Sequence, residues 1–84
     1  MNADQVRTQI EAGLPGSQAK VMTPDDTHFE AVVIAPQFAG KRALQRHQLV
    51  YATLGAAVGR EIHALSLEAH TPEEWAARPP AQGR

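Results

Sequence analysis

The chain has 84 residues and a mass of 9.1 kDa, which is enough for one small domain. Eight Lys and Arg residues oppose nine Asp and Glu residues, and the formal net charge of −1 argues against a whole-surface attraction to DNA or to anionic lipid. The sequence contains no Cys, which excludes a disulfide scaffold, a thiolate zinc site, a Cys nucleophile and an iron–sulfur cluster held by thiolates of this chain alone.

The first element in chain order is a predicted helix over residues 2–12. Asn2 is suited to the N-cap, and Gln5 stands three residues later, as in a capping box. Apolar residues then recur at helical spacing. The run Gly-Leu-Pro-Gly over residues 13–16 ends the helix, because Gly favours the left-handed turn after a helix and Pro cannot continue one.

Two strands follow and form a predicted hairpin. Residues 18–22 are a short strand candidate, and the Thr, Pro and Asp residues of 23–27 are typical of a turn. Residues 28–35 form a nearly continuous apolar stretch. Such a stretch is typical of a central strand that is covered on at least one face.

The carboxyl-terminal half is predicted to contain a long helix, a third strand and a short last helix. The long helix covers residues 41–58, and Gly55 is the point at which it kinks or divides. The third strand covers residues 62–69. Thr71, followed by Pro and then by Glu three residues on, starts the last helix with a capping box, and Trp75 anchors that helix onto the body.

The predicted fold is α+β with the order α-β-β-α-α-β-α, in which a three-stranded mixed sheet carries helices on one face. The second and third strands are expected to be parallel, because a right-handed crossover through the long helix joins them. Residues 1–77 are expected to form one domain and residues 78–84 a flexible tail. The sequence shows no export signal, and its longest nearly apolar run, 31–35, is far short of the ~20 residues that span a bilayer, so a cytoplasmic location is expected.

A basic group marks the start of the long helix. Lys41, Arg42 and Arg46 follow directly after Gly40, where the exposed amides of a helix start also attract anions. This group predicts a contact with phosphates of nucleic acid, whereas a solvated helix face is the plainer alternative. The order of elements is similar to that of type II KH modules, but the segment where their Gly-x-x-Gly loop belongs lacks the second Gly.

Four histidines are the transition-metal ligands that this chain offers. His28 opens the second strand and His63 opens the third, so parallel strands would bring both imidazoles to one edge of the sheet. Two imidazoles there would provide half of a four-coordinate site. His47 lies on the apolar stripe of the long helix, where a half-buried, hydrogen-bonded His is the plainer interpretation, and His70 is expected to be solvated.

No motif supports catalysis. Ser17 and Ser66 are the only serines, and neither lies in a nucleophile motif such as Gly-x-Ser-x-Gly. The sequence also lacks the phosphate-binding pattern Gly-x-x-x-x-Gly-Lys. We therefore expect no enzymatic activity.

One combination of residues resembles a known family. Phe38, Gly40, Arg46, His47 and Val50 match the pattern Phe-x-Gly-(x5)-Arg-His-x-x-Val of BolA-like proteins. Three further segments fit the same family, namely Thr-His-Phe at 27–29, Ile-His-Ala-Leu at 62–65 and Thr-Pro-Glu-Glu-Trp at 71–75. The resemblance covers residues 2 to about 77 and looks closest to the small IbaG-type branch.

The resemblance implies a fold related to type II KH domains and a role without catalysis. Family members pair with monothiol glutaredoxins and take part in iron–sulfur cluster assembly and trafficking or in iron regulation. The two proteins share a bridging [2Fe-2S] cluster, to which the glutaredoxin gives one thiolate and its bound glutathione another. Some members are described as DNA-binding regulators of morphology and stress genes, which makes duplex DNA the alternative partner here.

The family's histidine ligand carries over onto His63. The second ligand, Cys or His, usually comes from the loop between the first two strands, but residues 23–27 contain neither. Asp25 takes the place of the loop Cys, and His28 is the nearest imidazole that can substitute. The chain alone is expected to bind no cluster and to be a monomer or a weak homodimer. Since only neutral imidazole binds metal, assembly is expected to weaken below pH ~6.5.

A plainer alternative assigns a structural role to the signature itself. In that case Arg46 and His47 form a structural pair in a fold module, and His47 ties the long helix to the preceding loop.

Overall fold

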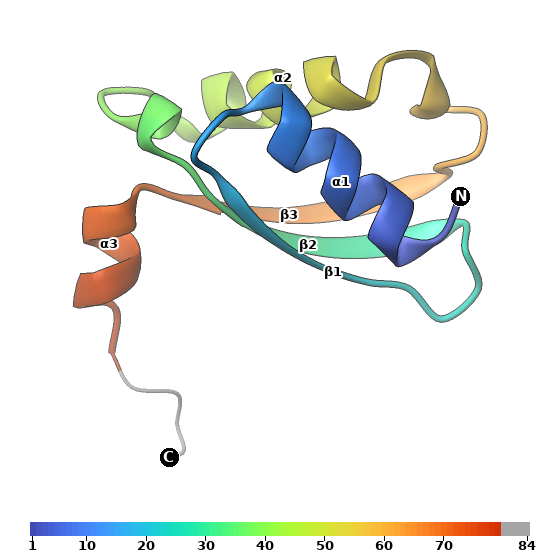
Figure 1. Cartoon of the computed structure of the whole chain (residues 1–84), viewed down its shortest axis with the longest axis horizontal. Coiled ribbons are helices and arrows are strands. Elements are labelled where there is room, and N and C mark those ends of the chain that lie inside the picture. Colours follow the sequence, from blue (N-terminus) through green and yellow to red (C-terminus); the bar gives the residue numbers. More distant parts are fainter. Residues whose placement is uncertain (80–84) are drawn as a thin grey trace.

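The computed structural model describes residues 1–79, which form a two-layer α+β domain (Figure 1). Its six main elements are α1 (Ala3–Gly13), β1 (Gln18–Met22), β2 (His28–Ile34), α2 (Ala43–Leu54), β3 (Ala64–His70) and α3 (Pro72–Ala77), with short 3-10 turns at η1 (Pro36–Phe38) and η2 (Gly55–Ala57). Of the predicted flexible tail 78–84, residues 80–84 lie outside the described part of the chain. Within residues 1–79 no helix is both long and apolar enough to cross a bilayer.

Two helices begin at the predicted capping boxes. Asn2 Oδ1 accepts a hydrogen bond from the Gln5 amide at 2.8 Å, and Gln5 Oε1 accepts one from the Asn2 amide at 2.9 Å. At α3, Thr71 Oγ1 and Glu74 Oε1 make the same reciprocal pair of bonds at 3.1 and 3.0 Å. Each box satisfies two amide groups that have no partner inside the helix.

The sheet has the order β1-β2-β3, with β1 antiparallel and β3 parallel to β2. The predicted hairpin and crossover are therefore confirmed. Gly55 adopts a φ of 58°, which ends α2 and separates it from η2, as the sequence indicates. The third strand begins later than predicted, because Ile62 is instead buried at 1% exposure and forms an isolated bridge with Val58.

The core lies between the sheet and the layer formed by α1 and α2 (Figure 1). Alternate residues of β1 and β2 face this layer, as period-two strands require. The largest fully buried side chains come from α1, β2, η1, α2 and the segment before β3: Val6, Ile10, Val33, Phe38, Val50 and Ile62.

The prediction of helices on one face holds for α1 and α2, whereas α3 lies beyond the carboxyl end of β3 (Figure 1). Trp75 of α3 meets side chains on the opposite face of the sheet. Its ring lies 5.4 Å from that of His70, and Lys20 Nζ lies 5.6 Å from the Trp75 ring. Trp75 thus anchors the last helix, as predicted, but it does so on the face that α1 and α2 leave open.

Candidate functional site

Two imidazoles meet at the edge where β2 and β3 start. The parallel register pairs His28 with Ala64, and the His63 amide donates a hydrogen bond to the Thr27 carbonyl at 2.8 Å. The ring centroids of His28 and His63 lie 6.5 Å apart, with an angle of 65° between the ring planes. The prediction that both histidines reach one edge of the sheet is confirmed.

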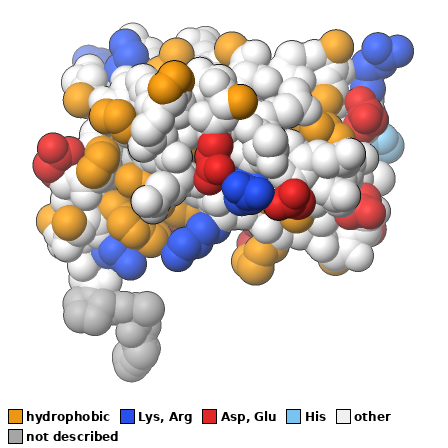
Figure 2. All heavy atoms as spheres, viewed as in Figure 1, with side chains coloured by type: hydrophobic (Ala, Val, Ile, Leu, Met, Phe, Trp, Pro, Cys, Tyr) orange, Lys and Arg blue, Asp and Glu red, His pale blue; other side chains and the backbone are white. Residues whose placement is uncertain are grey.

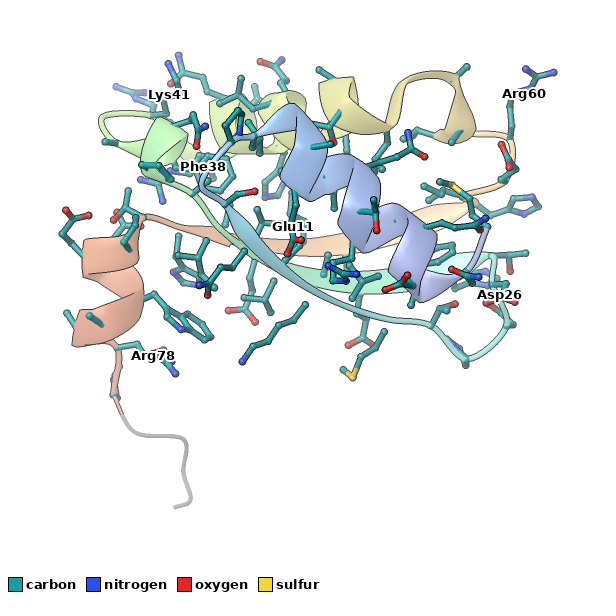
Figure 3. The ribbon with its side chains drawn as sticks, in the orientation of Figure 1. Glu11, Asp26, Phe38, Lys41, Arg60 and Arg78 are labelled. Atoms are coloured by element: carbon teal, nitrogen blue, oxygen red, sulfur yellow. The ribbon has the colours of Figure 1, made fainter. Side chains whose placement is uncertain are left out.

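The loop before His28 is held by Thr23. Its hydroxyl donates to the His28 carbonyl at 2.6 Å and accepts from the Asp26 amide at 2.9 Å. Asp26 adopts a φ of 62°, in the left-handed region that Asp tolerates better than most residues. Figure 3 shows Asp26 in this loop, at the end of the sheet remote from α3. The loop therefore has a defined hydrogen-bonded shape.

Asp25 is the centre of this loop. Its Oδ1 accepts hydrogen bonds from the amides of Thr27 and His28 at 3.0 and 2.9 Å, and its Oδ2 lies 2.7 Å from His28 Nδ1. These bonds hold the pKa of the Asp25 carboxyl well below its usual range, and the bond from the His28 amide has the largest effect. This contact was not among the predictions from sequence, although the spacing Asp-x-x-His indicates it.

The donor set fits a shared metal centre rather than a closed one. The His28 side chain is 61% exposed, and His63 is also exposed. Within residues 1–79, no group of three or more His, Asp or Glu side chains is placed to hold a metal ion. Two accessible nitrogen donors at one edge can complete a site only with ligands from another molecule.

Arg46 is bound within the fold. Its Nη1 and Nη2 donate to Glu74 Oε1 and Oε2 at 2.6 and 3.0 Å, while Nη1 and Nε reach the carbonyls of Ala69 and Lys41 at 3.1 and 2.9 Å. Its side chain is only 13% exposed, and its guanidinium lies 5.8 Å from the ring centroid of Phe38. The structure corrects the prediction that Arg46 contacts phosphate, because its N–H groups already donate to Glu74 and to two backbone carbonyls.

The ion pair with Arg46 also shifts the ionisation of Glu74. The hydrogen bond from Arg46 lowers the pKa of the Glu74 carboxyl to about 2, and the Thr71 amide acts in the same direction. Both contacts favour the charged carboxylate. Glu74 thus caps α3 and fastens it to α2 at the same time.

The rest of the basic group stays exposed. Gly40 adopts a φ of 74° in the turn before α2, and Lys41 and Arg42 are exposed. Figure 3 shows Lys41 at the outer surface near the start of α2. On the face drawn in Figure 2, basic and acidic side chains are interspersed rather than gathered into one stripe. Two exposed cations thus remain of the three-residue basic group.

The other two histidines lie away from this edge. His47 is half-buried beside Tyr51, with 6.5 Å between ring centroids, but within residues 1–79 its side chain makes no hydrogen bond. The predicted tie between the long helix and the preceding loop is made by Arg46 instead, through the Lys41 carbonyl. His70 is partly covered by Trp75 and lies 3.1 Å from Glu68 Oε1, so it is not simply solvated.

Comparison with known proteins gives consistent matches. A family profile described as BolA-like protein matches residues 8–74. BolA-like protein 1 of Homo sapiens is 44% identical over 50 residues, which cover 60% of this chain and 36% of the relative. The DNA-binding transcriptional regulator BolA of Escherichia coli (strain K12) is 35% identical over 65 residues, which cover 69% of this chain and 62% of the relative.

Solved structures agree with these matches. A BolA protein homologue from Coxiella burnetii superimposes with a TM-score of 0.81 at 43% identity, over 90% of this chain and 97% of that one. The aligned segments span roughly a third to three fifths of the two curated relatives. Since the family profile covers most of the sequence and the fold is the same, the chain belongs to the BolA-like protein family.

Proposed function

We propose that the chain is a non-enzymatic partner of a monothiol glutaredoxin in iron–sulfur cluster assembly, trafficking and iron homeostasis. In this role His63 and His28 bind one side of a bridging [2Fe-2S] cluster. The glutaredoxin and its bound glutathione supply thiolates on the other side. The cluster is the shared cargo of the two proteins.

The observation that carries the proposal is the pair of exposed imidazoles at one sheet edge, 6.5 Å apart, in a chain without thiols. Nitrogen donors alone do not make the usual thiolate shell of an iron–sulfur cluster, so the partner must provide the sulfur ligands. Mixed ligation by His and Cys is known from Rieske centres, where it raises the reduction potential. The resemblance in the signature residues supplies the identity of the partner.

A reconstitution experiment tests the proposal. The full chain is mixed anaerobically with a monothiol glutaredoxin, glutathione, iron and sulfide, and the visible absorption and circular dichroism are recorded. We expect a heterodimer whose spectrum differs from that of the glutaredoxin homodimer. A mixture that shows only the homodimer spectrum would overturn the proposal, as would a cluster retained by the chain alone.

A second candidate function is binding to duplex DNA through Lys41 and Arg42. The relative from Escherichia coli is named as a DNA-binding transcriptional regulator, and these two cations are exposed beside Gly40. The segment lies near α3, at the other end of the sheet from the His28 and His63 edge (Figure 3). The two functions therefore do not compete for the same surface.

The salt dependence of DNA binding tests this candidate. Two phosphate contacts predict a slope of about −1.8 for log affinity against log salt, and Lys41→Ala with Arg42→Ala should abolish it. Arg60→Ala, an exposed cation in the turn before β3, is the matched control and should leave the slope unchanged. No binding at low salt, or an equal loss in the control, would exclude this function.

A further inference from the structure

We propose that Asp25 is a positioning residue, which holds the proton of neutral His28 on Nδ1 and leaves Nε2 as the metal-binding nitrogen. The inference rests on the proposed function, because it concerns how the second histidine of that site is prepared. Asp25 Oδ2 lies 2.7 Å from His28 Nδ1, which is a normal length for a charge-assisted hydrogen bond. A contact with Asp25, in the loop before β2, thus fixes the His28 ring.

The chemistry of the acceptor decides which nitrogen carries the proton. An ionised carboxylate only accepts hydrogen bonds, so a neutral imidazole facing it must place its N–H toward it. The backbone amides of Thr27 and His28 both donate to Asp25 Oδ1, and such donors stabilise the ionised carboxylate. Thr27 Oγ1 also lies 3.0 Å from His28 Nδ1, but a hydroxyl both donates and accepts and does not select a tautomer by itself.

The loop prepares Asp25 for this task before any partner binds. Both of its oxygens are engaged, Oδ1 by the amides of Thr27 and His28 and Oδ2 by the imidazole. The carboxylate therefore acts through His28 and is not itself a free ligand. The remaining ring nitrogen, Nε2, makes no hydrogen bond to any residue of the described part of the chain.

A carboxylate that holds the second nitrogen of a metal-bound histidine is a common arrangement in proteins. It fixes the ring orientation and raises the basicity of the ligand nitrogen. The contact thereby makes His28, the first residue of β2, a metal ligand with a fixed orientation. Asp25 and His28 together thus replace the Cys or His ligand that the family usually has in the loop between the first two strands.

The test compares Asp25→Asn with Asp26→Asn. In Asp25→Asn the amide oxygen can still accept the two backbone bonds, but the NH2 group then faces His28 Nδ1, which must become an acceptor. Asp26 is the adjacent carboxylate, and its side chain makes no hydrogen bond within residues 1–79. Asn also tolerates its left-handed φ, so Asp26→Asn removes the same charge without touching His28.

The first readout is the tautomer of His28 in the full chain without metal. Two-bond 1H–15N correlation spectra at about pH 8, where histidine is ordinarily neutral, report which ring nitrogen is protonated. We expect Nδ1–H in the wild type and in Asp26→Asn, and Nε2–H in Asp25→Asn. A wild-type His28 that carries its proton on Nε2 would overturn the proposal, whatever the cluster does.

The second readout is cluster formation with a monothiol glutaredoxin and glutathione. We expect Asp25→Asn to hold the heterodimer cluster roughly 10–100-fold more weakly, with an altered circular dichroism spectrum, and Asp26→Asn to match the wild type. If Asp25→Asn switches the tautomer yet binds the cluster as the wild type does, the positioning role is wrong and the proposed function stands. If the wild type forms no heterodimer cluster, the proposed function fails, and the positioning role fails with it.

Discussion

Arg46 of α2 and Glu74 of α3 form a two-point ion pair, with Nη1 and Nη2 donating to Oε1 and Oε2 at 2.6 and 3.0 Å. The two residues are 28 positions apart in the sequence. The same guanidinium bonds the Ala69 carbonyl at the end of β3 and the Lys41 carbonyl before α2. Arg46 therefore ties α2 and the turn before it to the β3–α3 segment, whose contacts lie 23 and 28 positions later in the sequence.

The first prediction concerns the stability supplied by Arg46. Arg46→Ala should lower the free energy of unfolding by about 1–3 kcal/mol, because it removes two hydrogen bonds to backbone carbonyls that each contribute about 0.5–1.5 kcal/mol. Urea unfolding of wild type, Arg46→Ala, Glu74→Gln and the double variant measures the coupling. Glu74→Gln is the matched change, since Gln still accepts at the cap but loses the charge. Additive effects would contradict a direct interaction.

The second prediction concerns how the stability supplied by Glu74 depends on pH. The folded pKa of Glu74 is lowered to about 2 from an ordinary value of 4.5, mainly by the bond from Arg46. A lowered folded pKa means that the stabilisation is present above pH 4.5 and is lost as pH falls toward 2. The stability difference between wild type and Glu74→Gln should shrink across this window in thermal unfolding scans. A difference that stays constant from neutral pH to pH 2 would contradict the assignment.

The third prediction concerns His63. His63→Ala should reduce cluster binding in the glutaredoxin mixture at least roughly tenfold, while its melting temperature stays close to that of the wild type. The side chain is exposed and makes no hydrogen bond within residues 1–79, so its loss leaves the fold intact. His70→Ala is the control, because it removes an imidazole that packs on Trp75 at the other end of β3. An unchanged spectrum in His63→Ala would show that another group binds the cluster.

The fourth prediction concerns the contact between α1 and α2. A Cβ at Gly13 would lie 2.5 Å from Thr53 Cγ2 and 2.8 Å from Thr53 Cβ. Gly13→Ala should therefore destabilise the fold by about 1–3 kcal/mol, although Ala is the better helix former. Thr53→Ser removes Cγ2 but keeps the hydroxyl that donates to the Val50 carbonyl, and it should recover part of the loss in denaturant unfolding. No recovery in the double variant would locate the strain elsewhere.

Local chemistry explains why much of the fold could be predicted from the sequence. The capping boxes at Asn2 and Thr71 involve residues three positions apart, so the sequence contains the whole interaction. The bounds of β1 coincide with the predicted 18–22, because turn-forming residues enclose a short alternating segment. The crossover rule predicts that His28 and His63 lie at one edge of the sheet. The link to type II KH domains and to the IbaG-type branch stays a prediction.

Contacts that depend on the placement of α3 could not be predicted. The engagement of Arg46 by Glu74 depends on how α3 folds back at the end of β3, which no local pattern encodes. The same holds for Trp75, which meets Lys20 on the open face of the sheet. The Asp25–His28 contact differs, because the two residues are three positions apart and the sequence contains the whole interaction.

The burial of Ile62 has a consequence for which side chains residue 63 can carry. Ile62 is buried in the core and the His63 amide donates to the Thr27 carbonyl, so two contacts hold the backbone at residue 63. The side chain at 63 takes no part in either anchor. Imidazole, thiol or carboxylate at residue 63 should therefore be interchangeable without a change in the backbone, so the chemistry of this position can vary independently of folding.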